Sequence, residues 1–281
     1  MRVVAILIIV ILTTSAVALT LRSSAVTKAR VDRFARRHRL SVTAANQDQV
    51  IAYLRTTRRW RLAGVVGGIA LPAFFTTSAE QGLTIGFLPV LVGWFVGALA
   101  AEARVSHLAH GERRAASLAP RSAERYVPPT VRALVPVTTG LCIATAVATV
   151  IAALAGREIP PTAAAVPLAF AMGVAAAVWM VWHSVLLHRP QPPTDPDVLA
   201  ADDAIRSRSL HVLGVAGAVL IFACITFQLD ALLGPGQWGP ALGVALLVVA
   251  FLGWIAATGV WQVPRPTAPP ARVGAARPMD P

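Results

Sequence analysis

The chain has 281 residues, of which 56% are hydrophobic and 14% are charged, and its formal net charge is +12. Soluble globular domains carry about 25% charged residues, so this composition excludes an ordinary soluble domain and indicates a protein that places most of its surface in lipid. The excess of basic residues does not by itself indicate a nucleic-acid partner, and we expect none, because the basic residues follow the apolar segments in a pattern typical of membrane proteins.

Seven apolar windows predict membrane-spanning helices, each of which needs about 20 mostly apolar residues. The second window is short and contains Pro72. We therefore expect an all-α integral membrane protein, a bundle of seven transmembrane helices that occupies residues 1–263. The predicted spans, in chain order, are 3–21, 62–77, 83–101, 133–155, 163–187, 210–233 and 241–263.

The first window resembles a secretory signal, because Arg2 precedes it and Ala16-Val17-Ala18 forms a small-residue cleavage site. If it were cleaved, every basic loop that follows would face outward, which contradicts the cytoplasmic bias of basic residues. We therefore expect an uncleaved anchor with its N-terminus outside the cell.

The segment 22–61 is the largest polar unit and is predicted to be a cytoplasmic loop. Its arginine-rich first half has Val31 and Phe34 as apolar points. Asn46 and Gln49 predict a capping box for a basic amphipathic helix that runs into the second span, and such helices lie on membrane surfaces. We expect four arginines of this helix to contact anionic lipid or a partner protein: Arg55, Arg58, Arg59 and Arg61. The simpler alternative is a solvated connector whose arginines only set the topology.

Glycines in and beside the second and third spans recur four residues apart, a spacing that lets helix backbones approach closely in membranes. The pairs are Gly64 and Gly68, Gly82 and Gly86, and Gly93 and Gly97. Two short matches further suggest an internal 3+1+3 repeat of a kind found in transporters. They pair Gly64-Val65-x-Gly67 with Gly214-Val215-x-Gly217, and Gly93-Trp94 with Gly253-Trp254.

The stretch 199–210, just before the sixth span, is the most distinctive polar segment. Asp202 and Arg206 are four residues apart, a spacing that predicts an exposed ion pair on a helix. We expect a juxtamembrane helix here whose pair offers a docking point for lipid or a partner protein. A capped helix start without a partner is the alternative.

No Asp, Glu, Lys or Arg lies in the middle of a predicted span, which argues against a pump, an ion channel or a proton-coupled transporter. Glu102 and Asp230 lie at span ends, where we expect water to reach them. Uncharged polar residues could line a substrate path, although helical hydroxyls usually bond their own backbone. They are Thr138, Thr139, Thr145, Thr149, Thr226 and Gln228.

Five histidines gather toward the predicted cytoplasmic face, near Glu102, Asp202 and Asp203. They are His107, His110, His183, His188 and His211. The chain has no HExxH motif, and a single His-x2-His pair leaves the other metal ligands unspecified. We therefore predict no metal, no cofactor and no catalytic residue, and a membrane enzyme that uses these histidines is the third hypothesis.

Basic residues occupy every second gap between the apolar windows: 23 of the 25 lie in the segments 22–61, 102–132, 188–209 and 264–281. Because basic residues are retained in the cytoplasm, these segments and the C-terminus are predicted to lie inside the cell. The proline-rich tail 264–281 is expected to be disordered. The excess of arginine over lysine, 24 to one, is typical of a GC-rich bacterial genome and indicates a bacterial inner membrane.

These observations favour a multi-pass protein of the cell membrane without enzymatic activity. We expect an accessory or scaffold subunit whose basic cytoplasmic face engages anionic lipid or a cytoplasmic or membrane partner protein. The alternative is a permease for a small neutral or amphiphilic solute, which rests on the suggested repeat and on prolines at similar depth, Pro72 and Pro89.

Overall fold

The computed structural model describes residue 18 and residues 26–75, 87–107, 123–187 and 195–234. Within these residues the chain is helical, joined by turns, and contains no strand. The helices are α2 (Lys28–His38), α3 (Gln47–Phe75), α4 (Phe87–His107), α5 (Ala123–Tyr126), α6 (Pro129–Leu154), α7 (Thr162–Met180), the π-helix η1 (Val181–Leu187) and α8 (Pro196–Leu233).

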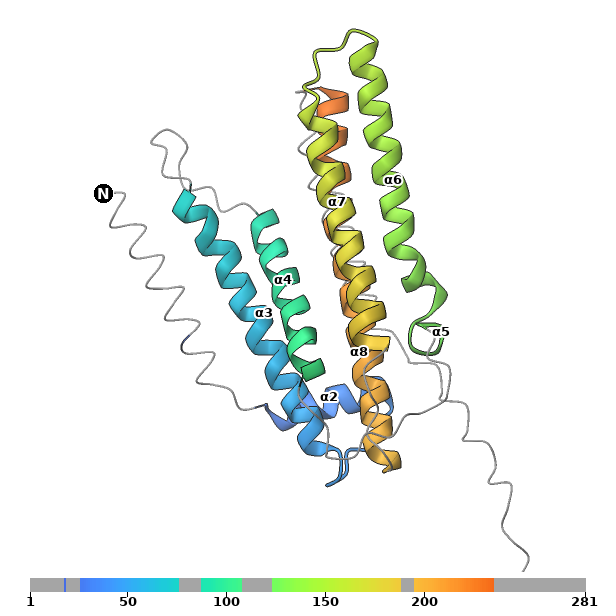
Figure 1. Cartoon of the computed structure of the whole chain (residues 1–281). Coiled ribbons are helices and arrows are strands. Elements are labelled where there is room, and N and C mark those ends of the chain that lie inside the picture. The colour runs from blue at the N-terminus through green and yellow to red at the C-terminus, as the bar shows by residue number, and fades with distance from the viewer. Residues whose placement is uncertain (1–17, 19–25, 76–86, 108–122, 188–194, 235–281) are drawn as a thin grey trace, which may run out of the picture.

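The helices form two groups that stand side by side (Figure 1). α6, α7 and α8 pack into a three-helix bundle, and α3 and α4 form an antiparallel hairpin next to it. α8 is the central element, because it contacts α3, α4, α5, α6, α7 and η1. α2 lies across the lower end of the hairpin and the bundle.

Four of these helices are long and apolar enough to cross a membrane: Leu88–Ser106, Pro129–Leu154, Thr162–Ser184 and Pro196–Leu233. They correspond to the predicted spans 83–101, 133–155, 163–187 and 210–233. The predicted spans 3–21 and 241–263 lie outside the described residues, apart from residue 18. The helical character of the fold and these four apolar helices therefore agree with the sequence prediction, whereas the full set of seven spans stays a prediction.

α3 contains the predicted second span and confirms that one helix runs from the polar loop into it. Its apolar part, from Leu62 to Phe75, is shorter than a bilayer crossing requires, and the residues that follow lie outside the described chain. The described part of α3 therefore covers less than a complete span.

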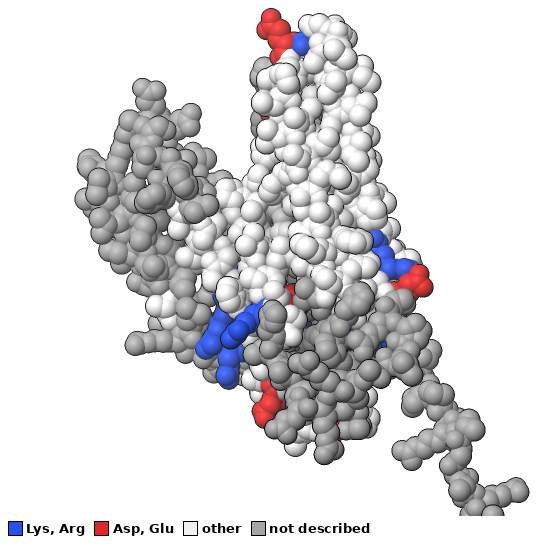
Figure 2. Space-filling view, viewed as in Figure 1, with Lys and Arg blue, Asp and Glu red and all other residues white. Residues whose placement is uncertain are grey.

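The surface of the described helices is uncharged between two charged ends (Figure 2). α6 and α7 expose large apolar side chains along this zone, as expected for helices that face lipid tails rather than water. Examples are Val137, Leu141, Val147, Ile151, Phe170 and Met172. This arrangement explains how a chain with so few charged residues can be folded without an exposed apolar surface in water.

α8 is 38 residues long, which at 1.5 Å per residue is about 57 Å and exceeds the roughly 30 Å of a hydrocarbon core. It begins where expected from its sequence: the side chain of Asp195 accepts a hydrogen bond from the Asp197 amide at 2.8 Å, and Pro196 occupies the first turn. The first third of α8 therefore continues beyond the length that one bilayer crossing needs. The predicted juxtamembrane helix and the sixth span are one continuous element.

Glycines allow α3 and α4 to touch through their backbones. A Cβ atom added to Gly64 would lie 2.0 Å from the carbonyl oxygen of Gly93, and one added to Gly68 would lie 2.3 Å from that of Pro89. On α4, a Cβ at Gly97 would lie 2.3 Å from the Trp60 carbonyl oxygen. The predicted close approach is confirmed for these glycines, while Gly82 and Gly86 lie outside the described residues.

The glycines that suggested an internal repeat have different neighbours. Gly64 faces the α4 backbone, whereas its match Gly214 faces the ring of Trp182. Gly67 meets no atom within 4 Å, whereas its match Gly217 faces the Val178 side chain. The second match involves residues outside the described chain, so the 3+1+3 repeat stays a prediction without support from packing.

The predicted capping box at the start of α3 is wrong. Neither polar atom of the Gln49 side chain has a hydrogen-bond partner in the described chain. The Asn46 amide instead donates to the Asp197 carbonyl oxygen at 3.1 Å and to that of Ser41 at 2.9 Å, while its own oxygen accepts the Thr43 N–H. Asn46 therefore ties the loop before α3 to the start of α8.

Candidate functional site at the charged end of the bundle

Buried polar and charged groups gather around the first third of α8. Most of them lie on α8 itself, and α3 and α4 contribute the others. They are Thr57, Glu102, Asp202, Arg206, Ser207, Ser209 and His211. Burying a charge costs free energy unless the charge is paired or hydrogen-bonded. We therefore expect these groups to have polar partners.

Asp202 and Arg206 form the ion pair that their spacing predicts, but the pair is buried and not exposed. The Arg206 Nε donates to the Asp202 Oδ2 at 2.7 Å, and both side chains are 0% exposed. The prediction of an exposed pair is wrong because the segment 199–210 is not a free juxtamembrane helix: α2, α3, α4 and η1 enclose this part of α8. Two buried side chains cannot present charge to lipid or to a partner at the surface.

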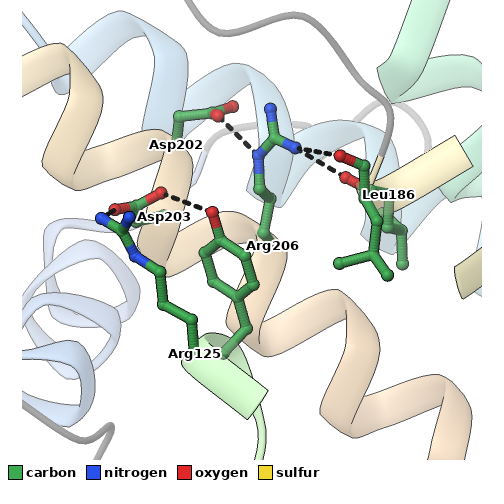
Figure 3. A network of polar contacts seen from close by, with 7 residues as sticks. Arg125, Leu186, Asp202, Asp203 and Arg206 are labelled. Atoms are coloured by element: carbon green, nitrogen blue, oxygen red, sulfur yellow. Dashed lines mark hydrogen bonds and ion pairs between the residues drawn. The ribbon is translucent and has the colours of Figure 1, made fainter. Parts of the chain in front are cut away.

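The Arg206 guanidinium caps the end of η1. Its Nη1 donates to the carbonyl oxygens of Leu186 at 2.7 Å and Leu187 at 3.5 Å (Figure 3). Carbonyl groups in the last turn of a helix have no partner within that helix, and a positive charge there is favourable to the helix dipole. Arg206 therefore has a structural role, and Asp202 neutralises the buried charge that this cap requires.

α5 is fastened to the same region of α8. Asp203 accepts hydrogen bonds from Arg125 at 3.1 Å and from the Tyr126 hydroxyl at 3.2 Å. The side chains of Arg125 and Asp203 point toward one another in Figure 3. The Ser207 hydroxyl donates to the Tyr126 carbonyl oxygen at 2.8 Å. Burial raises the pKa of Tyr126 above its usual value, so this hydroxyl remains a hydrogen-bond donor.

A second buried network joins α3, α4 and α8. The Ser209 hydroxyl donates to Glu102 Oε2 at 2.6 Å, so the Tyr53 hydroxyl, 3.1 Å from Ser209 Oγ, is the donor in their contact. Arg61 Nη2 lies 3.7 Å from Glu102 Oε1, which makes an ion pair too long for a hydrogen bond. Glu102 is only 1% exposed, so the expectation that water reaches it is wrong, whereas Asp230 is exposed as expected.

α2 covers this second network. Val31 and Phe34, the predicted apolar points of the loop, are buried against Val50, Tyr53 and Ile205. The opposite face of α2 is exposed and basic. We define the basic face of the protein as the exposed residues of α2 and α3: Lys28, Arg30, Arg33, Arg36, Arg55 and Arg59.

No family model, no curated protein and no solved structure matches this chain. The features that bear on function are therefore the burial, the exposure and the pairing of these groups. Of the six predicted contact residues, Arg55 and Arg59 are exposed, Arg58 and Arg61 are partly buried, and Asp202 and Arg206 are buried.

The threonines of the spans bond their own backbones, as the simpler interpretation predicted. Each hydroxyl contacts a carbonyl oxygen three or four residues earlier in its helix; they are Thr138, Thr139, Thr145, Thr149 and Thr226. Gln228 is 0% exposed and connects three helices of the bundle. Its oxygen accepts from Thr145 and Cys142 of α6, and its amide donates to the Ala164 carbonyl oxygen of α7. These groups hold the helices together and leave little polar capacity for a solute.

The predicted histidine group is only partly within the described chain. His110 and His188 lie outside it, and His107 ends α4. His183 stacks on Trp179 with ring centroids 4.6 Å apart, and its Nδ1 lies 2.9 Å from the Trp179 carbonyl oxygen. In the described residues no group of three His, Cys, Asp or Glu side chains is placed to hold a metal ion.

His38 at the end of α2 was not singled out from the sequence. Because its pKa is lowered, we expect the packing of α2 against the other helices to depend on pH. Burial, followed by the charges of Arg208, Arg37 and His211, lowers the pKa of His38 from 6.5 to about 4. A histidine with a lowered folded-state pKa stabilises the fold above its unfolded pKa and loses this contribution as pH falls. We expect destabilisation of up to about 3 kcal/mol between pH 6.5 and pH 4, measured by unfolding in detergent.

The matched variant for this experiment is His38→Gln, which keeps a polar side chain that does not titrate. It should show a smaller loss of stability over the same pH range than the natural protein. Equal slopes for both proteins would mean that other groups cause the pH dependence and that His38 does not.

Proposed function

We propose that the protein is a multi-pass protein of a bacterial cell membrane without enzymatic activity, an accessory or scaffold subunit that engages anionic lipid through its basic face. The observation that carries this proposal is the position of that face. Exposed arginines of α2 and α3 lie at one of the two charged ends of helices that are uncharged and apolar between those ends. Basic residues beside an anionic leaflet contribute about 1 kcal/mol each to membrane attraction.

The division between exposed and buried charges supports this proposal. Asp202, Arg206 and Glu102 are used internally, where they cap a helix or hold α4 against α8. Arg55 and Arg59 of the basic face are instead exposed on α3 and take no part in these internal contacts. A basic face that remains available after the internal pairs have formed is suited to an anionic partner.

Binding to vesicles tests the lipid interaction. We expect the purified protein, in detergent-free nanodiscs, to associate with vesicles of phosphatidylcholine and phosphatidylglycerol but weakly with phosphatidylcholine alone. Replacement of Arg55 and Arg59 by Gln should weaken this association about 30-fold, because two charges near the surface are removed. Loss of the effect at high salt would confirm its electrostatic origin.

The control replaces Glu124 by Gln, an exposed change in charge outside the basic face, whose carboxylate pairs with Arg132 at 2.7 Å. This variant should bind as well as the natural protein or slightly better. Equal binding of the natural protein to neutral and anionic vesicles would reject the proposed function. A reporter fused near Phe34 that proved to lie outside the cell would reject the sidedness on which it depends.

A further inference from the structure

Arg208 of α8 and Arg61 of α3 lie next to the buried network of Glu102 and Ser209, and Arg37 of α2 adds positive charge near them. Arg208 of α8 is repelled by Arg61 of α3 and by Arg37 of α2, and it is attracted by Glu102. Glu102 already accepts the Ser209 hydroxyl through one of its oxygens. The three guanidinium groups therefore carry more positive charge than the neighbouring carboxylate in the described chain neutralises.

Two of these arginines, Arg61 and Arg208, hold N–H groups without acceptors among the described residues. The Nε of Arg208 and the Nε and Nη2 of Arg61 are buried and have no hydrogen-bond partner in the described part of the chain. Their guanidinium groups lie against aromatic rings, Arg208 at 5.6 Å from the Phe34 centroid and Arg61 at 5.4 Å from that of Trp94. A buried charged donor without an acceptor is unfavourable, so these groups are poised for an anion that brings oxygen atoms.

These arginines remain within reach of a ligand. The Arg61 side chain is 14% exposed, and Arg37 and Arg208 are also partly exposed. By contrast, Arg206 is fully buried and fully engaged with Asp202 and Leu186. The arginines that lack acceptors are thus the ones that a group at the surface could contact.

The place of Arg61 along α3 selects a lipid headgroup as the source of the anion. Arg61 directly precedes the apolar part of α3, and its neighbour Trp60 is 42% exposed. Tryptophan beside an apolar helical segment is typical of the membrane interface, which is where phospholipid phosphates lie. Guanidinium groups also match the oxygens of a phosphate in geometry and charge.

We propose that Arg61 and Arg208, with further positive charge from Arg37, form a binding site for the phosphate group of one anionic phospholipid. This inference rests on the proposed function, because it requires the basic end to face an anionic leaflet. It adds one defined site, which binds one lipid molecule, to the general attraction between the basic face and anionic lipid.

Lipid that remains bound through purification tests the site. The protein is purified in mild detergent after incubation with phosphatidylglycerol, and the retained lipid is counted by native mass spectrometry. We expect about one tightly retained molecule, and we expect the double variant Arg61→Gln, Arg208→Gln to bind it roughly tenfold more weakly or worse, because charge-assisted hydrogen bonds are lost. The matched variant Arg104→Gln, Arg132→Gln removes two charges outside both the site and the basic face and should retain the lipid.

If both double variants retained the phosphatidylglycerol equally, or both lost it equally, the proposed binding site would be contradicted. Either result is compatible with the proposed function if vesicle binding still prefers phosphatidylglycerol, whereas equal binding to neutral vesicles would reject the proposed function itself. Inorganic phosphate should not displace the lipid at equal concentration. Displacement with retention of inorganic phosphate would show a soluble anion as the ligand and would overturn the assignment to lipid.

Stability measurements separate a binding role of Arg208 from a structural one. Arg208→Gln leaves no carboxylate without its hydrogen-bond partner among the described residues and relieves repulsion from Arg37 and Arg61, so the lipid-free variant should melt at the same temperature as the natural protein or higher. Added phosphatidylglycerol should then raise the melting temperature of the natural protein more than that of the variant. A lower melting temperature without lipid, together with an unchanged response to lipid in Arg208→Lys and Arg208→Gln, would overturn the proposal.

Discussion

Replacement of Gly64 by alanine should force α3 and α4 apart and destabilise the protein by about 3 kcal/mol or more. The added Cβ would lie 2.0 Å from the Gly93 carbonyl oxygen and 2.9 Å from the Gly97 Cα. Both atoms belong to the backbone, so no side chain can rotate away, and overpacking of even an adaptable core costs about 1–3 kcal/mol. Denaturant unfolding in detergent micelles measures this loss.

Gly67→Ala is the control for this prediction, because it makes the same chemical change three residues further along α3. A Cβ at Gly67 would meet no atom within 4 Å, and alanine is favoured over glycine in a helix by about 0.5–1 kcal/mol. This variant should be as stable as the natural protein or slightly more stable. Similar unfolding midpoints for Gly64→Ala and Gly67→Ala would show that the backbones of α3 and α4 do not touch as described.

Replacement of Arg206 by glutamine should be about as damaging, with an expected loss of roughly 3–5 kcal/mol, the usual cost of removing one partner from a buried ion pair. The change removes the Arg206 partner of the buried Asp202 carboxylate and weakens the cap on the Leu186 carbonyl oxygen. Thermal unfolding in detergent, followed by circular dichroism, gives the difference from the natural protein. Arg132→Gln, which breaks the exposed pair with Glu124, should change stability by about 1 kcal/mol or less.

A double variant separates the charge from the cap. When Asp202 and Arg206 are replaced together by Leu and Met, no buried charge is left alone, and such replacements are often neutral or stabilising. Here the end of η1 would still lack its donor, so we expect only part of the stability to return. Full recovery would mean that Arg206 does not act as the cap of η1.

Long apolar runs were sufficient to locate the helices α6 and α7. The ends of the predicted spans 133–155 and 163–187 lie within four residues of the ends of α6 and of α7 with η1. Each depends on a long run of apolar residues, which is a property of a single segment. The glycine spacing on α3 and α4 was equally local, and the backbone contact of Gly64 with Gly93 followed from it.

The polar networks could not be predicted from local sequence patterns, because they join residues that are far apart in the chain. Asn46 has the residue type and position of a helix cap. Its side-chain amide instead donates to the carbonyl oxygen of Asp197, which is 151 residues away in the sequence. The spacing of Asp202 and Arg206 predicts their pairing, whereas their burial results from α2, α3 and η1. Tyr53 and Arg208 were missed for the same reason.

One signal for the second network was present in the sequence. Asp202, Arg206 and Ser209 follow one another at intervals of four and three residues, which places them on one face of α8. A polar stripe that continues toward an apolar span indicates a partner helix with complementary polar groups. Glu102 of α4 is that partner for Ser209.

α8 is an uninterrupted helix, whereas α6 and α7 contain Pro136 and Pro167 in their interiors. Arg206 near its lower end and Gln228 near its upper end both bind neighbouring helices, and the 22 residues between them correspond to about 33 Å of stiff rod. A small tilt or axial shift imposed at one terminus of such a rod reappears at the other with little attenuation. α8 is therefore the continuous element along which a movement at the Arg206 end of the bundle would reach the Gln228 end.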